Sequence, residues 1–361
     1  MSRALRRLAA SCLCLSVLAG CSNEGIVDHI RIVSVLGFDK NEAGYSGTAL
    51  YADYAGKGKI TTLRANAKQT NLVLNEFDLQ SAKHVRIEKL RMLFFSKSLA
   101  EQGISSFLKT ICKDPLISNY LIMAVSEESA AALSESLAGK ESIELPYHLI
   151  EHNMRRGTIP LSNLSTVLFD YYGTGRDFSV PYLRLNGKGD IEIAGYGIFK
   201  DDRLKLVLNR NEMLHYKMLQ GKYLKGDIPF TVSDGKREGS AIFSINYGKQ
   251  YKTVDAEPNK AQINFNFQLN GMVKEYPEWF DLKDEAYNDR LLAQLEAQIR
   301  DKLSSLLLKL QEEKVDPLGI GDLVRSRRRS WSEEQFYAAE YSNVDFGIRL
   351  HLRISKSGIG E

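Results

Sequence analysis

The stretch QINFNFQLN, residues 262–270, alternates polar and apolar side chains along its whole length. Its apolar positions are Ile263, Phe265, Phe267 and Leu269, and the positions between them are asparagine or glutamine. Successive side chains of a strand point to opposite faces of a sheet, so this strand has one apolar and one polar face. Antiparallel sheets commonly pack one face on a core and leave the other in water. The stretch therefore predicts a strand of an antiparallel sheet.

Two further segments of the last third carry the same pattern. VDFGIRLHLRI, residues 344–354, alternates throughout, and AIFSINY, residues 241–247, is a third strand of this kind. A long helix is predicted over 284–313, where leucine and isoleucine recur at steps of three and four residues. We expect this helix to lie on the apolar face of the sheet, where each large side chain contributes about 1.5 to 3 kcal/mol.

Strand and helix patterns also follow one another through the first two thirds of the chain. Apolar runs such as IRIVSVLGFD, residues 30–39, and YLIMAVS, residues 120–126, read as strands. LAEQGISSFLKTICKD, residues 99–114, has apolar side chains at helical spacing. This order indicates α/β or α+β layering, and the length of the chain indicates two or three domains. The predicted units are a signal peptide at 1–20, an N-terminal α+β domain at 21–140, a middle domain at 141–230 and a C-terminal α+β domain at 231–356.

The first 21 residues have the layout of a bacterial lipoprotein leader. Three arginines precede an uncharged run from Leu8 to Leu18, which is shorter than the roughly 20 apolar residues that span a bilayer. LAGC, residues 18–21, resembles the lipobox, in which a diacylglyceryl group is joined to the cysteine sulfur and cleavage leaves Cys21 as the first residue. Two acyl chains anchor a protein stably. The alternative is a plain signal peptide that happens to contain cysteines, because Cys12 and Cys14 lie in the same run.

Composition argues against several classes of protein. Without the three arginines of residues 1–20, the 48 Lys+Arg of the chain become 45, which equals the 45 Asp+Glu. A nucleic-acid binder usually has a basic surplus, so no nucleic-acid partner is expected. Cys21 and Cys112 are the cysteines left after residue 20, and a lipidated Cys21 leaves no intrachain disulfide. After the leader, no run approaches about 18 uninterrupted apolar residues, so no transmembrane helix is predicted.

One motif has the spacing of a metal site. His148-Leu-Ile-Glu151-His152 fits H-x-x-E-H, which on a helix puts both histidines on one face to bind zinc, with Glu151 as general base. A third protein ligand is also needed, and no later glutamate stands in a recognisable context for it. The alternative, which we favour, is an exposed amphipathic helix turn after Pro146. We therefore expect no catalytic residue, no metal and no cofactor.

The remaining candidate groups are weaker. GTGRD, residues 173–177, and GKGD, residues 187–190, lack the Lys-Ser/Thr of a phosphate-binding loop and are predicted to be turns. Cys112 lies on an apolar helical face and is predicted to be an inert core thiol. The remaining histidines are scattered without a Ser-His-Asp order: His29, His84, His215 and His351.

Two surfaces are possible contact sites. RSRRRSW, residues 325–331, is the basic cluster of the chain; most such runs are a solvated helix face, and a minority contact anionic lipid or an acidic partner. The asparagines and glutamine of 262–270 could form a contact surface, although such a ladder is more often the wet side of a sheet.

Several segments together resemble the Ger(x)C family, the lipoprotein C subunits of spore nutrient germinant receptors. In chain order they are LAGC at 18–21, IVSVLGFDK at 32–40, HVRIEKLRMLFFSKSLAEQGI at 84–104, GYGIFKDDRLKLVLNRNE at 195–212, KVDPLGIGD at 314–322 and NVDFGIRLHLRISKSG at 343–358. The ordered set is more specific than any one piece. Many relatives have Trp-Asp directly after the lipidated cysteine, where this chain has Ser22 and Asn23, a local departure that leaves the lipid site intact.

The resemblance implies an α+β fold of three domains, each a largely antiparallel or mixed sheet packed with helices. It also implies that a lipid on Cys21 tethers them to the outer side of the spore's inner membrane. It implies two integral membrane partners, the A and B subunits, in the nutrient response that starts germination, and it carries over no catalytic residue. The hypothesis is thus a non-enzymatic receptor subunit. A substrate-binding lipoprotein for uptake, and a zinc hydrolase using His148, Glu151 and His152, stand as alternatives.

Overall fold

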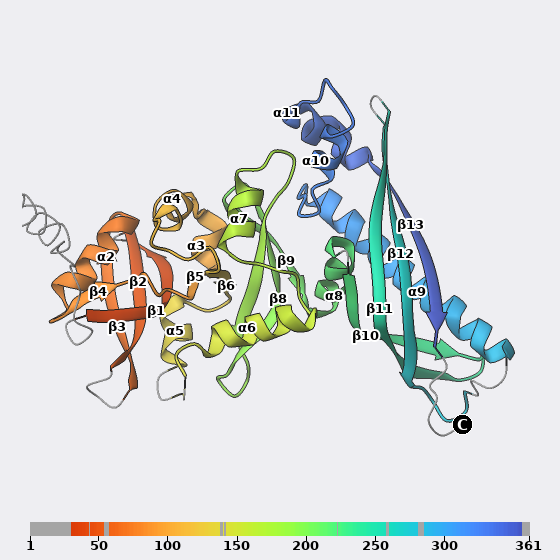
Figure 1. Cartoon of the computed structure of the whole chain (residues 1–361), viewed down its shortest axis with the longest axis horizontal. Helices are drawn as coiled ribbons and strands as arrows, with labels where there is room; N and C mark the ends of the chain where they lie inside the picture. Colours follow the sequence, from red (N-terminus) through yellow and green to blue (C-terminus); the bar gives the residue numbers. More distant parts are fainter. Residues whose placement is uncertain are drawn as a thin grey trace, which may run out of the picture.

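The computed structural model describes residues 30–42, 44–53, 58–137, 140, 142–221, 223–257, 260–280 and 285–355. These residues form two sheets packed with helices, which confirms the predicted α+β class. Figure 1 shows the first sheet at the N-terminal end of an elongated molecule and the second sheet at the other end.

The first sheet is mixed and has nine strands. They are β1 (Ile30–Asn41), β2 (Gly44–Asp53), β3 (Lys59–Ala67), β4 (His84–Arg86), β5 (Met92–Ser96), β6 (Ile122–Ser126), β7 (Ser179–Leu185), β8 (Ile191–Lys200) and β9 (Arg203–Asn209). Their spatial order is β3-β2-β1-β5-β6-β7-β8-β9, with β4 beside β1. The central pairs from β1 to β7 are parallel, whereas the pairs at both ends are antiparallel.

This sheet crosses the boundary that the sequence predicted at residue 140. β6 pairs with β7, so that Val125 lies opposite Tyr182 and Ser126 opposite Leu183. The expected separate sheets of the first two domains are therefore one sheet. Periodicity could not show this, because it describes each strand alone and not the strand it will pair with. The division into three domains stays a prediction.

Helices cover both faces of the first sheet. They are α2 (Thr70–Leu79), α3 (Lys97–Gln102), α4 (Ser105–Lys109), η2 (Ile111–Lys113), α5 (Ala130–Glu135), α6 (Leu145–Arg156) and α7 (Leu164–Tyr171). Leu93 and Phe95 of β5 pack in the cluster with α2, α3, α4 and α7, whereas Met92 and Phe94 pack in the cluster with α5 and α6. The helix predicted at 99–114 is broken, because Gly103 adopts φ +122° after α3.

The second sheet has four strands in the order β10-β11-β12-β13. They are β10 (Tyr223–Ser233), β11 (Glu238–Glu257), β12 (Lys260–Glu275) and β13 (Asp345–Ile354). The expectation of an antiparallel sheet is right for β10 to β12 but wrong for β13, which pairs with β12 in parallel, Gln262 opposite Asp345. Parallel neighbours need a long crossover, and the connection from β12 to β13 contains a helix. The alternation survives because the apolar side chains of β13 still pack against the core, although they are only partly buried.

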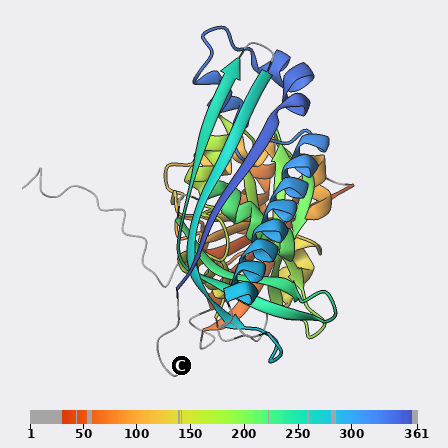
Figure 2. The ribbon, with the colours of Figure 1, turned by 90° about the vertical axis from the view of Figure 1, so that its right-hand side faces the viewer.

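The predicted long helix is confirmed as α9 (Glu285–Glu312). It lies along the sheet in Figure 2. Its buried side chains belong to the same cluster as the apolar face of β12: Leu291, Leu295, Ile299, Leu303, Leu306, Leu307 and Leu310 with Ile263, Phe265, Phe267 and Leu269. Burial of this stripe removes apolar surface from water and so holds α9 on the sheet. We call the first sheet with its helices the first unit, and the second sheet with α9 and the segment that follows it the second unit.

Helix α8 (Arg210–Gln220) joins the two sheets. Its N-cap is Asn209, whose side chain accepts hydrogen bonds from Asn211 and Glu212, and Glu212 completes the capping box. Tyr216 of α8 shares one apolar cluster with Tyr196 of β8 and with the apolar face of the second sheet. The core is thus continuous from the first sheet through α8 to the second.

Candidate functional site

The residues of the H-x-x-E-H motif lie on an exposed face of α6. His148 Nδ1 is 3.8 Å from Glu151 Oε2, and Glu151 Oε1 accepts hydrogen bonds from Tyr147 (3.1 Å) and Arg155 (2.8 Å). His152 is exposed on the next position. Partners in its own helix therefore occupy the carboxylate that would act as the base. Among the described residues, no group of three or more His, Cys, Asp or Glu is placed to hold a metal ion.

The other singled-out cysteines and histidines are not brought together. Cys21 and His29 lie outside the described residues. Cys112 is buried, and burial raises the pKa of its thiol to about 12, so little thiolate forms at neutral pH. The three histidines of this group that the structure describes lie on different elements: His84 on β4, His215 on α8 and His351 on β13.

The basic run 325–331 is partly tied back to the protein. Helix α10 (Ile320–Arg325) ends where the run begins, and Arg325 Nη2 lies 2.6 Å from Asp322 Oδ1. Arg328 pairs with Glu340 and donates to the carbonyl of Ala256 at 3.2 Å. The run is therefore not one solvated helix face.

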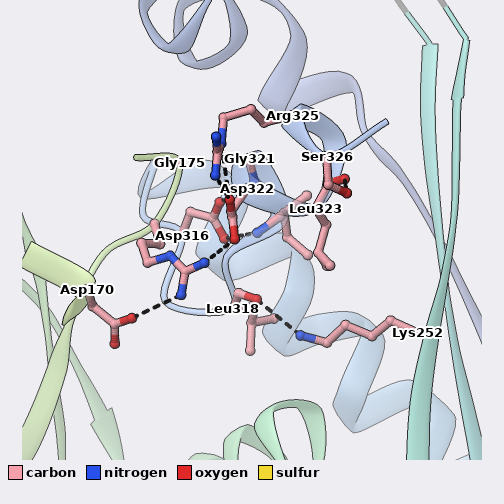
Figure 3. A network of polar contacts seen from close by, with 12 residues as sticks. Asp170, Gly175, Lys252, Asp316, Leu318, Gly321, Asp322, Leu323, Arg325 and Ser326 are labelled. Atoms are coloured by element: carbon pink, nitrogen blue, oxygen red, sulfur yellow. Dashed lines mark hydrogen bonds and ion pairs between the residues drawn. The ribbon is translucent and has the colours of Figure 1, made fainter. Parts of the chain in front are cut away.

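A buried polar junction forms where residues 314–322 meet residues 173–177 (Figure 3). The first segment follows α9 and the second connects α7 to β7. Asp177 N–H donates to Asp316 O at 2.9 Å, and Asp316 N–H donates to Asp177 Oδ2 at 2.7 Å. Asp322 N–H donates to Gly175 O at 2.9 Å. These reciprocal bonds attach the second unit to the loop at the edge of the first.

Asp316 is the fully buried centre of this junction. Its carboxylate accepts hydrogen bonds from the amides of Ile320 (2.8 Å) and Gly321 (2.7 Å) and from the hydroxyl of Tyr337 (2.8 Å). The two amides belong to the first turn of α10, where N–H groups have no acceptor within the helix, and Gly319 has no side chain to cap them. Burial raises the pKa of Asp316, and these hydrogen bonds oppose the shift. The carboxylate thus fixes the start of α10.

Two cations complete the junction. Lys200 Nζ lies 3.3 Å from both carboxylate oxygens of Asp177 and 4.1 Å from the ring centre of Tyr337. Burial raises the pKa of Asp177 to about 6, although Lys200 opposes the shift. Arg176 pairs with Asp322 and lies 3.4 Å from Asp170, whose pKa burial raises to about 6. Each of these acids has a basic or backbone partner, which suits a role in holding segments together.

Two clefts flank α8. The larger, of about 680 Å³, lies between α8, β10 and α9, and the smaller, of about 370 Å³, lies beside the junction. His215 lines the larger cleft; its Nδ1 bonds the carbonyl of Asn211 at 2.9 Å, while its Nε2 is buried without a hydrogen-bond partner. Burial lowers the pKa of His215, which favours the neutral ring.

The architecture defines a class of protein: two helix-covered sheets joined by a continuous core and a buried polar junction. Two family models match this chain in order, the spore germination protein N-terminal domain over residues 23–185 and the spore germination B3/GerAC like C-terminal domain over residues 194–358. The chain therefore belongs to the Ger(x)C family, the C subunits of spore germinant receptors.

Individual relatives agree with this membership. The chain is 24% identical over 355 residues to spore germination protein GerQC of Bacillus cereus, which covers 97% of this chain and 98% of that protein. It is 19% identical to the putative spore germination protein YfkR of Bacillus subtilis (strain 168), over 77% of this chain and 73% of that protein. The crystal structure of the GerBC protein has the same fold, with a TM-score of 0.59, 18% identity, and coverage of 88% of this chain and 96% of that one. Within the described part of the chain, no helix combines the length and apolarity needed to cross a bilayer.

Proposed function

We propose that this chain is the lipid-anchored, non-enzymatic C subunit of one nutrient germinant receptor. The observation that carries the proposal is the likeness to a spore germination protein over 97% of the chain. The lipobox LAGC at 18–21 supports an anchor on Cys21. The anchor holds the two sheets at the outer face of the spore's inner membrane, where two acyl chains give stable attachment.

The partners in this proposal are the integral membrane A and B subunits. Exposed apolar side chains around α7 support a role in contact: Leu116, Tyr120, Leu161, Phe169 and Tyr172. The start of α7 is held in place, because Leu164 N–H donates to Leu121 O at 2.7 Å. Aromatic side chains are enriched at protein interfaces relative to the rest of a surface. The acids of the junction are hydrogen-bonded or ion-paired to other parts of the chain. This supports a role of the chain in assembly with other proteins rather than in catalysis.

The anchor is tested by feeding sporulating cells an alkyne-tagged fatty acid and measuring its incorporation into the purified chain. The wild-type chain and the Cys12→Ser and Cys14→Ser variants should carry the label, and Cys21→Ser should lose it. The two leader variants are matched controls, because they remove a cysteine from the same segment. Label on the Cys21→Ser chain, or none on the wild type, would refute the anchor.

The receptor role is tested by deleting the gene. Spores should form normally but lose the response to one nutrient, and the wild-type gene should restore it. Co-purification of two integral membrane proteins with the tagged chain tests the partners. A deletant that still germinates with every nutrient, in a strain without redundant receptors, would exclude the proposal.

A further inference from the structure

The smaller cleft, of about 370 Å³, is built from both units of the molecule. Arg176 comes from the loop before β7, Lys217 and Gln220 come from α8, and Lys252 comes from β11. The segment after α9 closes another side with Leu318. Its volume falls within the roughly 300 to 1,000 Å³ of small-molecule sites.

Lys217 brings an unpaired charge to this cleft. It is half-buried near the end of α8, and its ammonium has no hydrogen bond or ion pair within the described part of the chain. Burial lowers its pKa, because the ammonium has lost part of its water without gaining a counter-charge. An anion in the cleft would supply that counter-charge.

Lys252 is the second under-used cation. Its side chain is half-buried, and its ammonium donates to Leu318 O at 3.1 Å. An ammonium has three N–H donors. The ammonium of Lys252 also lies 5.5 Å from the ring centre of Phe265, so it has one neutral acceptor and one ring face but no ion pair among the described residues. Burial lowers the pKa of Lys252 to about 8. The carboxylate of Asp316 attracts it, but that group already accepts three hydrogen bonds elsewhere.

The acids that line the cleft are already paired. Asp170 and Asp322 both lie against Arg176, and Asp322 also pairs with Arg325. Arg176 and Arg325, which lies outside the cleft, together balance Asp170 and Asp322. Lys217 and Lys252 are therefore the lining cations that have no ion pair among the described residues.

We propose that this cleft binds a small anion whose carboxylate or phosphate oxygens accept hydrogen bonds from Lys217 and Lys252. Bound there, the anion would touch α8, β11 and the loop before β7, and so strengthen the attachment of the second unit to the first. Charge-assisted hydrogen bonds of this kind are shorter and stronger than neutral ones. The inference stands independently of the proposed receptor role.

The test uses the chain without its leader, in sodium chloride, sodium phosphate or sodium succinate of equal ionic strength. Lysines are labelled briefly with an acetylating reagent, and the extent at each lysine is read by mass spectrometry. Phosphate or succinate should slow labelling of Lys217 and Lys252 several-fold relative to chloride. Lys302 is the internal control, because it is exposed on α9 and has no ion pair among the described residues. Protection by phosphate alone assigns a phosphoryl ligand, and protection by succinate alone assigns a carboxylate.

Thermal unfolding with the same salts gives a second measurement. The anion that protects should raise the unfolding temperature of the wild type and of Lys302→Met, but not of Lys217→Met combined with Lys252→Met. Both substitutions remove a half-buried charge, so the double variant should fold; if it does not, Lys217→Gln alone should weaken protection of Lys252. Equal labelling in all three salts, or an unchanged stabilisation in the double variant, would overturn the proposal.

Discussion

Asp177 and Asp316 are joined by two hydrogen bonds from their backbone amides, one to the carbonyl of Asp316 and the other to the carboxylate of Asp177. Each carboxylate is removed from water, and the hydrogen bonds and the Lys200 ammonium offset the cost of that burial. Because the groups share donors and acceptors, loss of one leaves the others buried without partners. A buried unsatisfied donor costs about 1 to 3 kcal/mol, so these residues act as a unit.

Burial of Asp177 predicts a particular pH dependence of stability. Its pKa is about 6 in the folded chain, against an ordinary value of 3.8. Between these values the folded state binds more protons than the unfolded state, so the contribution of Asp177 to the free energy of unfolding falls as pH rises from about 4 to 6. Asp177→Asn removes this titration. The stability of the wild type minus that of Asp177→Asn, from urea unfolding at several pH values, should therefore decrease across this window.

Asp190→Asn is the control for this measurement. The side chain of Asp190 is half exposed, and a hydrogen bond from Lys140 lowers its pKa, so its small contribution to the free energy of unfolding has the opposite sign. A difference for Asp177→Asn that stays flat, or that rises between pH 4 and 6, would show that the folded chain does not raise the pKa of Asp177.

At the scale of elements, the docking of 173–177 on 314–322 depends on a glycine. Gly175 has φ +79°, and a Cβ there would lie 2.5 Å from the amide nitrogen of Asp322. Gly157, at the end of α6, has φ +74° with nothing within 4 Å of its Cβ position. Alanine at either position meets the left-handed penalty of about 1 to 2 kcal/mol. Gly175→Ala also displaces Asp322, so it should lower the free energy of unfolding clearly more than Gly157→Ala in urea titrations. Equal losses would mean that the close approach is unimportant.

The elements that the sequence predicted best are those defined by local periodicity. Helix α9 ends within one residue of the predicted 284–313 at both ends, and the apolar face of 262–270 is the buried face. Pairing is not local, so neither the parallel β13 nor the β6–β7 contact was predictable from alternation.

The junction was hidden from sequence reasoning for a different reason. GTGRD, predicted to be a turn, forms a bend at 173–175 followed by irregular residues at 176–177, and KVDPLGIGD carries no motif beyond the family resemblance. Aspartate is rarely buried, so nothing in the residue type marks Asp316 as a core group. The usable signal was Asp316 placed four residues before a short helix that lacks a capping side chain at Gly319.

At the scale of the whole molecule, the boundary between the two family domains falls inside one sheet. The first model ends at residue 185 and the second begins at 194, whereas β7 and β8 pair across this point from Ser179 opposite Ile198 to Leu185 opposite Ile191. Tyr196 and Ile198 of β8 are buried in the cluster that continues into the second sheet. Sequence families therefore divide the chain at a place where the structure does not.

This arrangement predicts how the chain can be divided. A fragment 21–185 loses β8 and β9 and so exposes the apolar faces and the unpaired edge of β7, whereas a fragment 21–221 keeps all nine strands and α8. Both fragments lack the segment 314–322, so neither can form the junction. The comparison therefore tests only the effect of completing the sheet. The longer fragment should unfold cooperatively and resist limited proteolysis, while the shorter one should be cleaved many-fold faster or aggregate through its open edge. If fragment 21–185 is as resistant as 21–221, then β8 and β9 are a separable addition, and the nine-stranded sheet is not one folding unit.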